Sequence, residues 1–242
     1  MSGTPSGPAS GPASGAASDP ASGAASGPAS GAASGPVIRG FEPFDLPGMY
    51  EVCLRTGDSG RDATALYRDP YLLGHVYAGP YPVADPRLTF VLADSLGVAG
   101  YVVATADTMA FERWLESSWW PVLRAQHPRS QAVDPGDGTQ DWQRVAHLHD
   151  AGVTEDELYE RYPAHLHIDL LPRAQGAGTG RRLMETLLAA LRERGVPGVH
   201  LGVGSGNPGA RAFYLRIGFH EERVAGWGST MALDLRPPTL HH

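Results

Sequence analysis

A strand, a glycine-rich turn, a long helix and a second strand follow one another in the second half of the chain. In "AHLHIDLLP" (Ala164–Pro172), apolar and polar residues alternate as in a β-strand with one face in a core. From Gly178 the leucines recur every four residues, the period of an amphipathic helix. Gly195 and Pro197 end that helix, and "VHLGVG" (Val199–Gly204) predicts the next strand. Such a unit requires two parallel strands, so we expect an α/β domain.

Shorter signals predict the elements that flank this unit. Before it we expect a strand at Val37–Phe41, a helix at Phe44–Thr56, short helices and loops over 57–86, and a hairpin at Arg87–Asp107 with the turn "ADSLG". A mostly polar insertion at about 107–163 follows, in which "TEDE" (Thr154–Glu157) has capping-box spacing and predicts a helix to about Arg161. After residue 204 we expect a helix in "NPGARAFYLRIG" and a last strand in "WGSTMALDL".

Residues 1–36 differ in composition from the rest of the chain. They are built from Ser, Gly, Ala and Pro, with near-repeats of "SGPASGAAS" and Asp19 as the single charged residue. Such a segment has little to bury, so we expect a disordered tail, and it lacks the basic start and apolar run of a signal peptide. Residues 37–242 suit one domain. Its longest apolar run, Phe90–Ala106, is broken by Asp94, so no membrane helix is expected.

Several function classes are excluded by composition. The chain contains no lysine, which excludes a Walker-type phosphate loop and a lysine Schiff base. The formal charge of −7 argues against a nucleic-acid groove. Cys53 is the only cysteine, which excludes an internal disulfide and fits a reducing, cytoplasmic location. In its apolar segment Cys53 is expected to be packed rather than catalytic.

The stretch "QGAGTGRR" (Gln175–Arg182) places alternating glycines between the strand and the helix. Glycine lets the backbone approach a ligand closely, and successive N–H groups then converge with the positive helix end on an anion such as a phosphate. A flexible loop is the alternative that the pattern alone leaves open. A dinucleotide-binding loop would need a small residue at position 181, where Arg181 stands.

Two motifs in order carry a family resemblance. Gln175-x-x-Gly178-x-Gly180 is followed, after the next strand, by Asn207-x-x-Ala210-x-x-Phe213-Tyr214-x-x-x-Gly218-Phe219. With both motifs, the chain resembles the acetyl-CoA-binding half of the GCN5-related N-acetyltransferase (GNAT) family, over 37–235 and most strongly over 166–219. The resemblance implies the GNAT fold, a mixed, twisted β-sheet flanked by helices and splayed between its fourth and fifth strands. The insertion would then lie between strands three and four.

The resemblance also implies acetyl-CoA as cosubstrate and assigns its contacts. The backbones of Leu170 and Leu171 would pair with the pantetheine amides. The pyrophosphate would be held by main-chain N–H groups of Gln175, Gly176, Ala177, Gly178, Thr179, Gly180 and Arg181. Asn207 would face the cofactor, or cap the helix that begins at Pro208, or do both. Tyr214, two turns later, would act as general acid at the CoA sulfur, with simple packing as the alternative.

Direct attack on a thioester needs a neutral amine and a proton acceptor. The polar face of the strand at 165–171 lies where the family's general base is often found, which makes Asp169 the first candidate and His167 the second. A water relay without a single base is the third possibility. Asp107, together with Asp169, would bind a cationic acceptor, unless Asp107 serves only as a cap. The motifs "HLHD" and "HLHID" raise zinc binding, but hydrogen-bonded histidines are the preferred interpretation, and no metal site is predicted.

A narrower resemblance leaves two functions open. The segments "DPYLLGHVYAGPYP" and "YERYPAHLHIDLLP" and the hairpin are similar to the acetyltransferase-like domain of eukaryotic O-GlcNAcases. The chain is expected either to transfer acetyl from acetyl-CoA to a primary amine in a ternary complex, or to bind acetyl-CoA as a sensor or adaptor without turnover. The acceptor would be a small molecule or a protein lysine, with no nucleic-acid or membrane partner. Trp119 and Trp120 would wall its pocket or join the core. A monomer or a homodimer paired through the final strand is expected.

Overall fold

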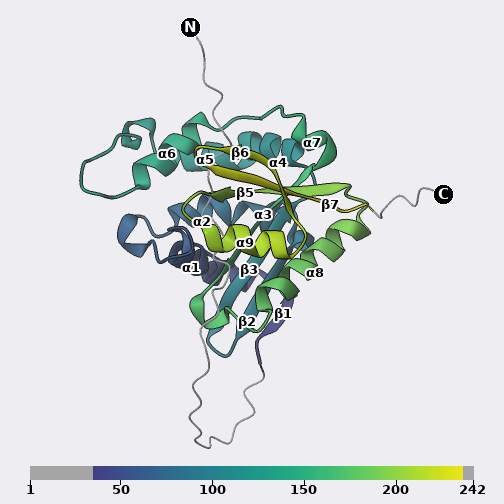
Figure 1. Ribbon diagram of the computed structural model, residues 1–242. Helices are drawn as coiled ribbons and strands as arrows, with labels where there is room; N and C mark the ends of the chain where they lie inside the picture. Colours follow the sequence, from purple (N-terminus) through teal and green to yellow (C-terminus); the bar gives the residue numbers. More distant parts are fainter. Residues whose placement is uncertain (1–34, 237–242) are drawn as a thin grey trace, which may run out of the picture.

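A computed structural model describes residues 35–236, so the predicted tail lies almost wholly outside the described residues (Figure 1). Its centre is a seven-stranded mixed sheet in the order β1-β2-β3-β4-β5-β7-β6. The strands are β1 (Val37–Gly40), β2 (Thr89–Asp94), β3 (Gly97–Thr105), β4 (Ala164–Leu170), β5 (Gly198–Gly204), β6 (His220–Ala225) and β7 (Gly228–Asp234). The predicted hairpin is β2–β3, and the predicted strand–helix–strand unit runs from β4 to β5.

The sheet opens between β4 and β5. These neighbours are parallel, but they pair only at Ala164 with Val199 and at His165 with His200. Beyond that point β4 continues to Leu170 along β3, and no strand of residues 35–236 pairs with its other side, while β5 continues along β7. The splay predicted between the fourth and fifth strands is therefore confirmed.

Helices cover both faces of the sheet. One face carries α8 (Thr179–Glu193) and α9 (Pro208–Arg216), and the other carries α1 (Leu46–Thr56), α2 (Leu72–Tyr77), α3 (Pro80–Ala84) and the insertion. The alternation along β4 decides which side chains face which layer. Leu166, Ile168 and Leu170 pack in the α8 cluster, as the sequence predicted, so the polar residues between them face α1 and the insertion.

The insertion between β3 and β4 is helical, as expected. It contains α4 (Thr108–Trp114), a π-helical turn (Leu115–Trp119), α5 (Trp120–Gln126), α6 (Asp141–Asp150) and α7 (Leu158–Arg161). The helix predicted from Thr154 is wrong in its start, because α7 begins only at Leu158. The Leu158 N–H donates to Asp156, and the Thr154 N–H donates to Glu112 instead of entering a capping box.

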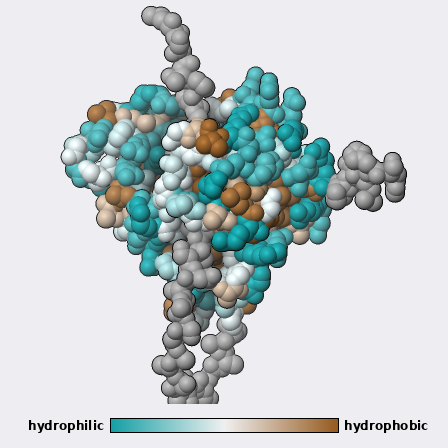
Figure 2. Space-filling model, viewed as in Figure 1, coloured by the Kyte–Doolittle hydropathy of each residue, from teal (hydrophilic) through white to brown (hydrophobic). Residues whose placement is uncertain are grey.

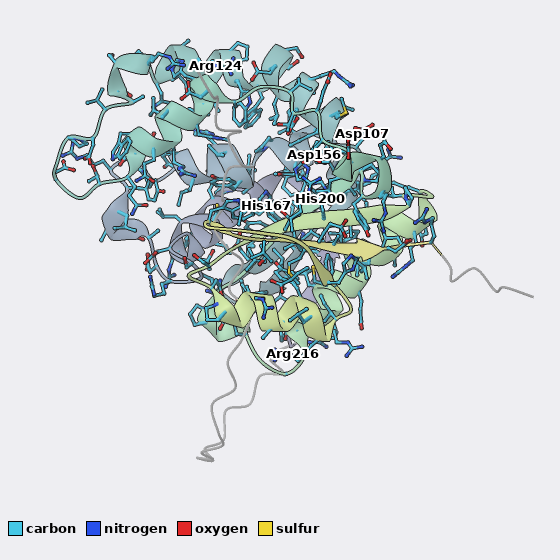
Figure 3. All side chains as sticks on the ribbon, turned by 45° about the horizontal axis from the view of Figure 1, so that its top comes forward. Asp107, Arg124, Asp156, His167, His200 and Arg216 are labelled. Carbon is cyan, nitrogen blue, oxygen red and sulfur yellow. The ribbon has the colours of Figure 1, made fainter. Side chains whose placement is uncertain are left out.

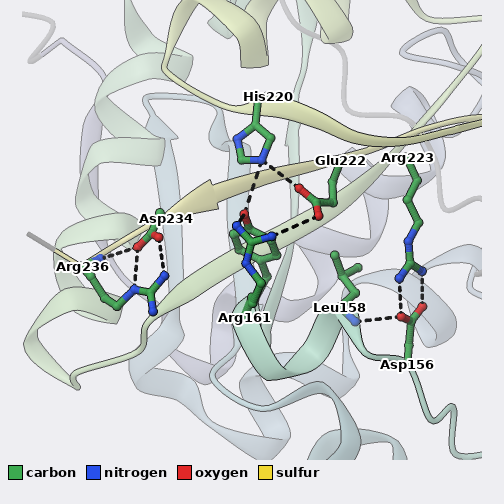
Figure 4. Close-up of polar contacts among 9 residues, drawn as sticks. Asp156, Leu158, Arg161, His220, Glu222, Arg223, Asp234 and Arg236 are labelled. Carbon is green, nitrogen blue, oxygen red and sulfur yellow. Dashed lines mark hydrogen bonds and ion pairs between the residues drawn. The ribbon is translucent and has the colours of Figure 1, made fainter. Parts of the chain in front are cut away.

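Strand β6 was missed by the sequence analysis. Its residues "HEERVA" are mostly exposed and show no apolar alternation, which suits a polar edge strand. Ion pairs tie it to the insertion: Arg223 forms two hydrogen bonds to Asp156, at 2.5 and 2.7 Å, and Glu222 lies 3.5 Å from Arg161 (Figure 4). Because β6 occupies the edge, the final strand β7 lies inside the sheet. The described sheet therefore leaves β7 no free edge for pairing across a two-fold axis, and a monomer or a homodimer remains a prediction.

Polar residues dominate the face drawn in Figure 2, with hydrophobic residues interspersed among them. Within residues 35–236 every helix is too short or too polar to span a bilayer.

Candidate functional site

The glycine turn has a backbone that few sequences could adopt. Gly176, Ala177 and Gly178 all have positive φ angles, of 83°, 49° and 72°, so three successive residues are left-handed. Glycine accepts this conformation at two of the three positions without steric cost. Gly178 is also the residue that precedes helix α8, and no side chain caps that helix end. The helix N-terminus is therefore left to a ligand or to solvent.

The backbone donors of this turn are available. Among the described residues no acceptor was found for the N–H groups of Gly176, Ala177, Gly178, Gly180 and Arg181. The Thr179 N–H donates to the Gly176 carbonyl, 3.1 Å away, and the Gln175 N–H to the Pro172 carbonyl, 3.2 Å away. Five free N–H groups next to a positive helix end form an anion-binding concavity.

Gly180 lets α8 lie close to β4. A Cβ at this position would stand 3.1 Å from Leu170 Cδ1 and 3.6 Å from the ring of Phe213. The third glycine of the motif therefore serves packing rather than backbone freedom. It sets the helix, and with it the free N–H groups, directly beside the last residue of β4.

The free edge of β4 carries backbone groups for an extended ligand. The Leu171 N–H donates to Ala99 on β3, and in an antiparallel pair the bonding direction alternates from residue to residue. The backbones of Ile168 and Leu170 therefore face the gap toward β5. The Leu170 carbonyl accepts from Gln175 Nε2 at 3.0 Å, whereas both backbone groups of Leu171 are engaged within the chain. The backbone of Ile168, rather than that of Leu171, therefore faces the gap.

Asn207 is the N-cap of α9 (Pro208–Arg216), the helix that follows β5, and Tyr214 lies within that helix. The Asn207 side chain caps the helix, because its Oδ1 accepts from the Ala210 N–H at 2.9 Å. This confirms the capping part of its predicted role. Tyr214 is 1% exposed and lies in the α8 cluster with its ring centroid 5.5 Å from that of Phe219. Its hydroxyl is thus carried inside the layer between sheet and helices.

Asp169 is a buried carboxyl held by a tyrosine. It is 1% exposed, and its Oδ2 accepts from the Tyr101 hydroxyl at 2.5 Å. Burial raises the pKa of Asp169 to about 6, and the hydrogen bond from Tyr101 opposes part of that rise. Among the described residues Oδ1 has no hydrogen-bond partner. Cys53 is fully buried next to this pair, and burial raises its thiol pKa, so the expectation of a packed cysteine is confirmed.

Three histidines lie where the sheet opens: His165 and His167 on β4 and His200 on β5 (Figure 3). His165 bonds through both nitrogens, to Tyr81 and Thr108, each at 2.8 Å. His167 makes no hydrogen bond to any described residue. Burial lowers the pKa of His167 to about 4, so its ring is neutral at pH 7 and both nitrogens remain usable. Within residues 35–236 no group of three metal-ligating side chains was found.

A cavity of about 260 Å³ lies at the end of β5, on the face opposite α8. Its lining comes from the loop after α1, from α2, from α6 and from the turns after β5 and β6: Gly57, Asp58, Ser59, Tyr67, Leu73, Tyr77, Gln140, Gln143, Arg144, Gly204, Ser205, Gly206 and Trp227. Gly202 and Gly204 alternate with the buried Val203, so the face of β5 toward the cavity carries no side chain there.

Neither the predicted catalytic residues nor the predicted aromatic wall lines this cavity. Trp120 is 3% exposed in the core beside α1, and the Trp119 indole donates to the His75 carbonyl at 2.9 Å. Asp107 caps α4, since its side chain accepts from the Ala110 N–H at 2.9 Å. The insertion contributes Arg144 and two glutamines instead, and the aromatic lining residues are Tyr67, Tyr77 and Trp227.

Known proteins share this fold. The chain is 41% identical to the solved structure of SsHAT, over 84% of this chain and 99% of that one, with a TM-score of 0.76. The family model "Acetyltransferase (GNAT) family" matches residues 137–219. The chain belongs to the GNAT family. A crystal structure described as an acetyltransferase, 18% identical over 83% of this chain and all of that one, shares the fold with a TM-score of 0.53.

The narrower resemblance is confirmed as well. Protein O-GlcNAcase from Rattus norvegicus and from Mus musculus is 22% identical to this GNAT chain over 184 residues, which are 76% of this chain. The matched part is 20% of each relative, so the chain spans about a fifth of the length of the curated relatives it matches.

Some of the site residues that the sequence analysis missed could have been found from the sequence pattern, and others could not. Ile168 and Gly202 follow from strand alternation once the direction of pairing is known. The lining residues of α6 and Trp227 carry no local motif, because five separate segments meet in the cavity.

Proposed function

We propose that this GNAT chain transfers the acetyl group of acetyl-CoA to a primary amine by direct attack in a ternary complex. The observation that carries the proposal is the gap between β4 and β5, which has free N–H groups at one end and a cavity on its opposite face. An extended thioester and an amine could therefore approach the same point from two sides. Membership of an acetyltransferase family supports the same reaction.

In this proposal the turn at 175–181 holds the pyrophosphate through Gly176, Ala177, Gly178, Gly180 and Arg181. Arg181 also adds a positive charge, although its guanidinium pairs with Glu185 at 2.8 Å. The backbones of Ile168 and Leu170 bind the pantetheine arm. Their N–H groups face the gap and are suited to polarise the thioester carbonyl.

The transfer forms a C–N bond and breaks the C–S bond. The amine proton passes to Asp169, the stronger base because its pKa is about 6 against about 4 for His167, or to the neutral His167 two residues earlier. A water relay between the two is the third route. The leaving thiolate takes its proton from Tyr214.

One observation favours the second function, an acetyl-CoA-binding module without turnover. Asp169 is 1% exposed beneath α1, so a water molecule or a movement of α1 would be needed to connect it with the amine. The chain would then keep the anion-binding turn and use the cavity for recognition alone.

The test follows free thiol with acetyl-CoA and a panel of lysine peptides, polyamines and amino sugars, and measures acetyl-CoA binding by calorimetry. The chain has no lysine, so any acetyl-lysine must lie on the added acceptor. Acceptor-dependent thiol release supports transfer. Binding of acetyl-CoA without thiol release in the presence of any acceptor supports the binding module. Absence of acetyl-CoA binding overturns both functions.

A further inference from the structure

The cavity at the end of β5 contains a positive charge, Arg144, that no acid among the described residues neutralises. Arg144 on α6 lies in its lining and is partly buried. Within residues 35–236 it forms no ion pair with a carboxylate, and its Nε is a buried donor without a hydrogen-bond partner. Its contacts are neutral ones: Nη1 donates to the Tyr77 hydroxyl, and the guanidinium lies 5.7 Å from the centre of the Tyr77 ring.

A buried guanidinium normally has a carboxylate or phosphate partner, because desolvation of the charge is costly. The one acid in the cavity lining, Asp58, is already paired with Arg61 at 3.0 Å. Gln140 and Gln143 precede Arg144 on the same wall and add neutral hydrogen-bonding groups. The lining therefore offers a free positive charge with amides around it, which is the composition of an anion-binding pocket.

The cavity also lies close to the strand on which the transfer is proposed to occur. Tyr77 forms part of its wall, and the ring of Tyr77 meets the ring of His167 edge-on at 5.6 Å between centroids. A molecule in the cavity is thus separated from β4 by one side chain. The Arg144 cavity and the part of β4 where acetyl transfer is proposed are therefore next to each other.

We infer that the acceptor is a small amine that also carries an anionic group, a carboxylate or a phosphate, which pairs with Arg144. This inference rests on the proposed transfer and narrows its substrate class. A volume of about 260 Å³ is near the lower limit of small-ligand pockets, about 300 Å³, so a small molecule fits better than a peptide segment. The free amine then extends from the anion toward His167.

The experiment compares matched amines that differ by one anionic group. The probes are L-lysine against cadaverine for the carboxylate, and D-glucosamine 6-phosphate against D-glucosamine for the phosphate, with a neutral lysine peptide as a fifth probe. Thiol release should have a kcat/KM at least about tenfold higher for the anionic member of one pair. The inference is overturned if cadaverine, D-glucosamine or the peptide gives a kcat/KM equal to that of both anionic probes.

Arg144→Gln should remove that preference by raising KM for the anionic amine at least about tenfold, while acetyl-CoA binding stays unchanged. Gln140→Glu is the second variant, because a carboxylate four residues before Arg144 on the same wall can pair with the guanidinium without removing it. This variant should also lose the preference for the anionic amine and have the higher kcat/KM with the neutral one. The matched control is Arg192→Gln, which removes an exposed charge on α8 outside the cavity and should leave the preference intact.

Failure of the proposed transfer is distinguishable from failure of this inference. If acetyl-CoA binds but no thiol is released with any probe, calorimetry measures the binding of the two anionic probes to the CoA-saturated protein. That binding tests the anion pocket by itself. Binding that Arg144→Gln abolishes supports the anion pocket without turnover. Absence of binding, or binding that survives Arg144→Gln, overturns it.

Discussion

The Tyr101 hydroxyl donates a 2.5 Å hydrogen bond to Asp169 across two directly paired strands, β3 and β4. Both residues are almost fully buried on the face covered by α1. This pairing fixes one carboxylate oxygen and leaves Oδ1 without a partner among the described residues. A buried carboxyl that is only half satisfied favours its neutral form, which is why its pKa rises.

The first prediction concerns stability against pH. The Asp169 carboxyl has an ordinary pKa of 3.8 when unfolded and about 6 when folded, so between those values the folded state holds more protons. The free energy of unfolding should therefore fall as pH rises from about 4 to about 6, by about 3 kcal/mol in total from this group. Asp169→Asn should remove that part of the slope, as measured by urea denaturation at several pH values.

The control for this prediction is Asp134→Asn. Asp134 is exposed, and its side chain accepts from the Gly136 N–H, a contact that asparagine preserves. The slope between pH 4 and 6 should be unchanged in this variant. If Asp169→Asn keeps the wild-type slope, Asp169 is not the group that titrates there.

The second prediction concerns activity against pH. If Asp169 accepts the amine proton, the reaction needs its ionised form, and kcat/KM for thiol release should rise through about pH 6. Asp169→Asn should abolish this rise and lower kcat by roughly 100-fold at neutral pH. A rise that persists in the variant would transfer the role to His167 or to water. His167→Gln then distinguishes these two.

The third prediction concerns the anion-binding turn. Gly178→Ala places a Cβ at a φ of 72°, where nothing lies within 4 Å, so the cost is conformational and should be about 1 kcal/mol of stability. Because Gly178 belongs to the turn that carries the free N–H groups, a strained backbone there should displace them, and the acetyl-CoA dissociation constant should rise about tenfold or more. Gly152→Ala, also exposed and without close neighbours, should change neither quantity. An unchanged affinity for Gly178→Ala would contradict the proposed pyrophosphate site.

How far the sequence predicts this molecule depends on the range of each signal. Period-two alternation in β4 and period-four leucines in α8 arise because each element packs against one layer, so both were predictable locally. The splay between β4 and β5 leaves no local sequence pattern. It was predicted only through the resemblance that the family motifs carry. Strand β6 escaped because an exposed edge strand has no apolar face to reveal it.

The site shows the same division. The anion-binding turn is contiguous, and its three left-handed residues follow from the glycines around Ala177. The "TEDE" motif misled because Glu112, far away in sequence, takes the Thr154 N–H that a capping box would use. Arg144 could not be assigned from its helix, because what distinguishes it lies in other segments: the one acid of the described lining, Asp58, is paired with Arg61 instead.

The fourth prediction separates two uses of Asn207. Asn207→Ala removes the bond to the Ala210 N–H and should cost about 1 kcal/mol of stability. Asn207→Ser retains a capping oxygen but has a shorter side chain, so stability should be nearly restored. If Asn207 also faces the cofactor, the Ser variant should still bind acetyl-CoA more weakly, by calorimetry. Wild-type affinity in the Ser variant would restrict Asn207 to capping.

The fifth prediction tests Tyr214 as the acid that protonates the leaving thiolate. Tyr214→Phe keeps the buried ring in its layer, so acetyl-CoA affinity should change by less than about threefold, while kcat should fall by roughly 100-fold. Tyr71→Phe, which removes a hydroxyl from a ring that is 60% exposed, is the control and should keep full activity. Pre-steady-state thiol release measures the step directly. A parallel loss of affinity and kcat would instead assign Tyr214 to packing, because a structural defect would disturb the cofactor gap as a whole.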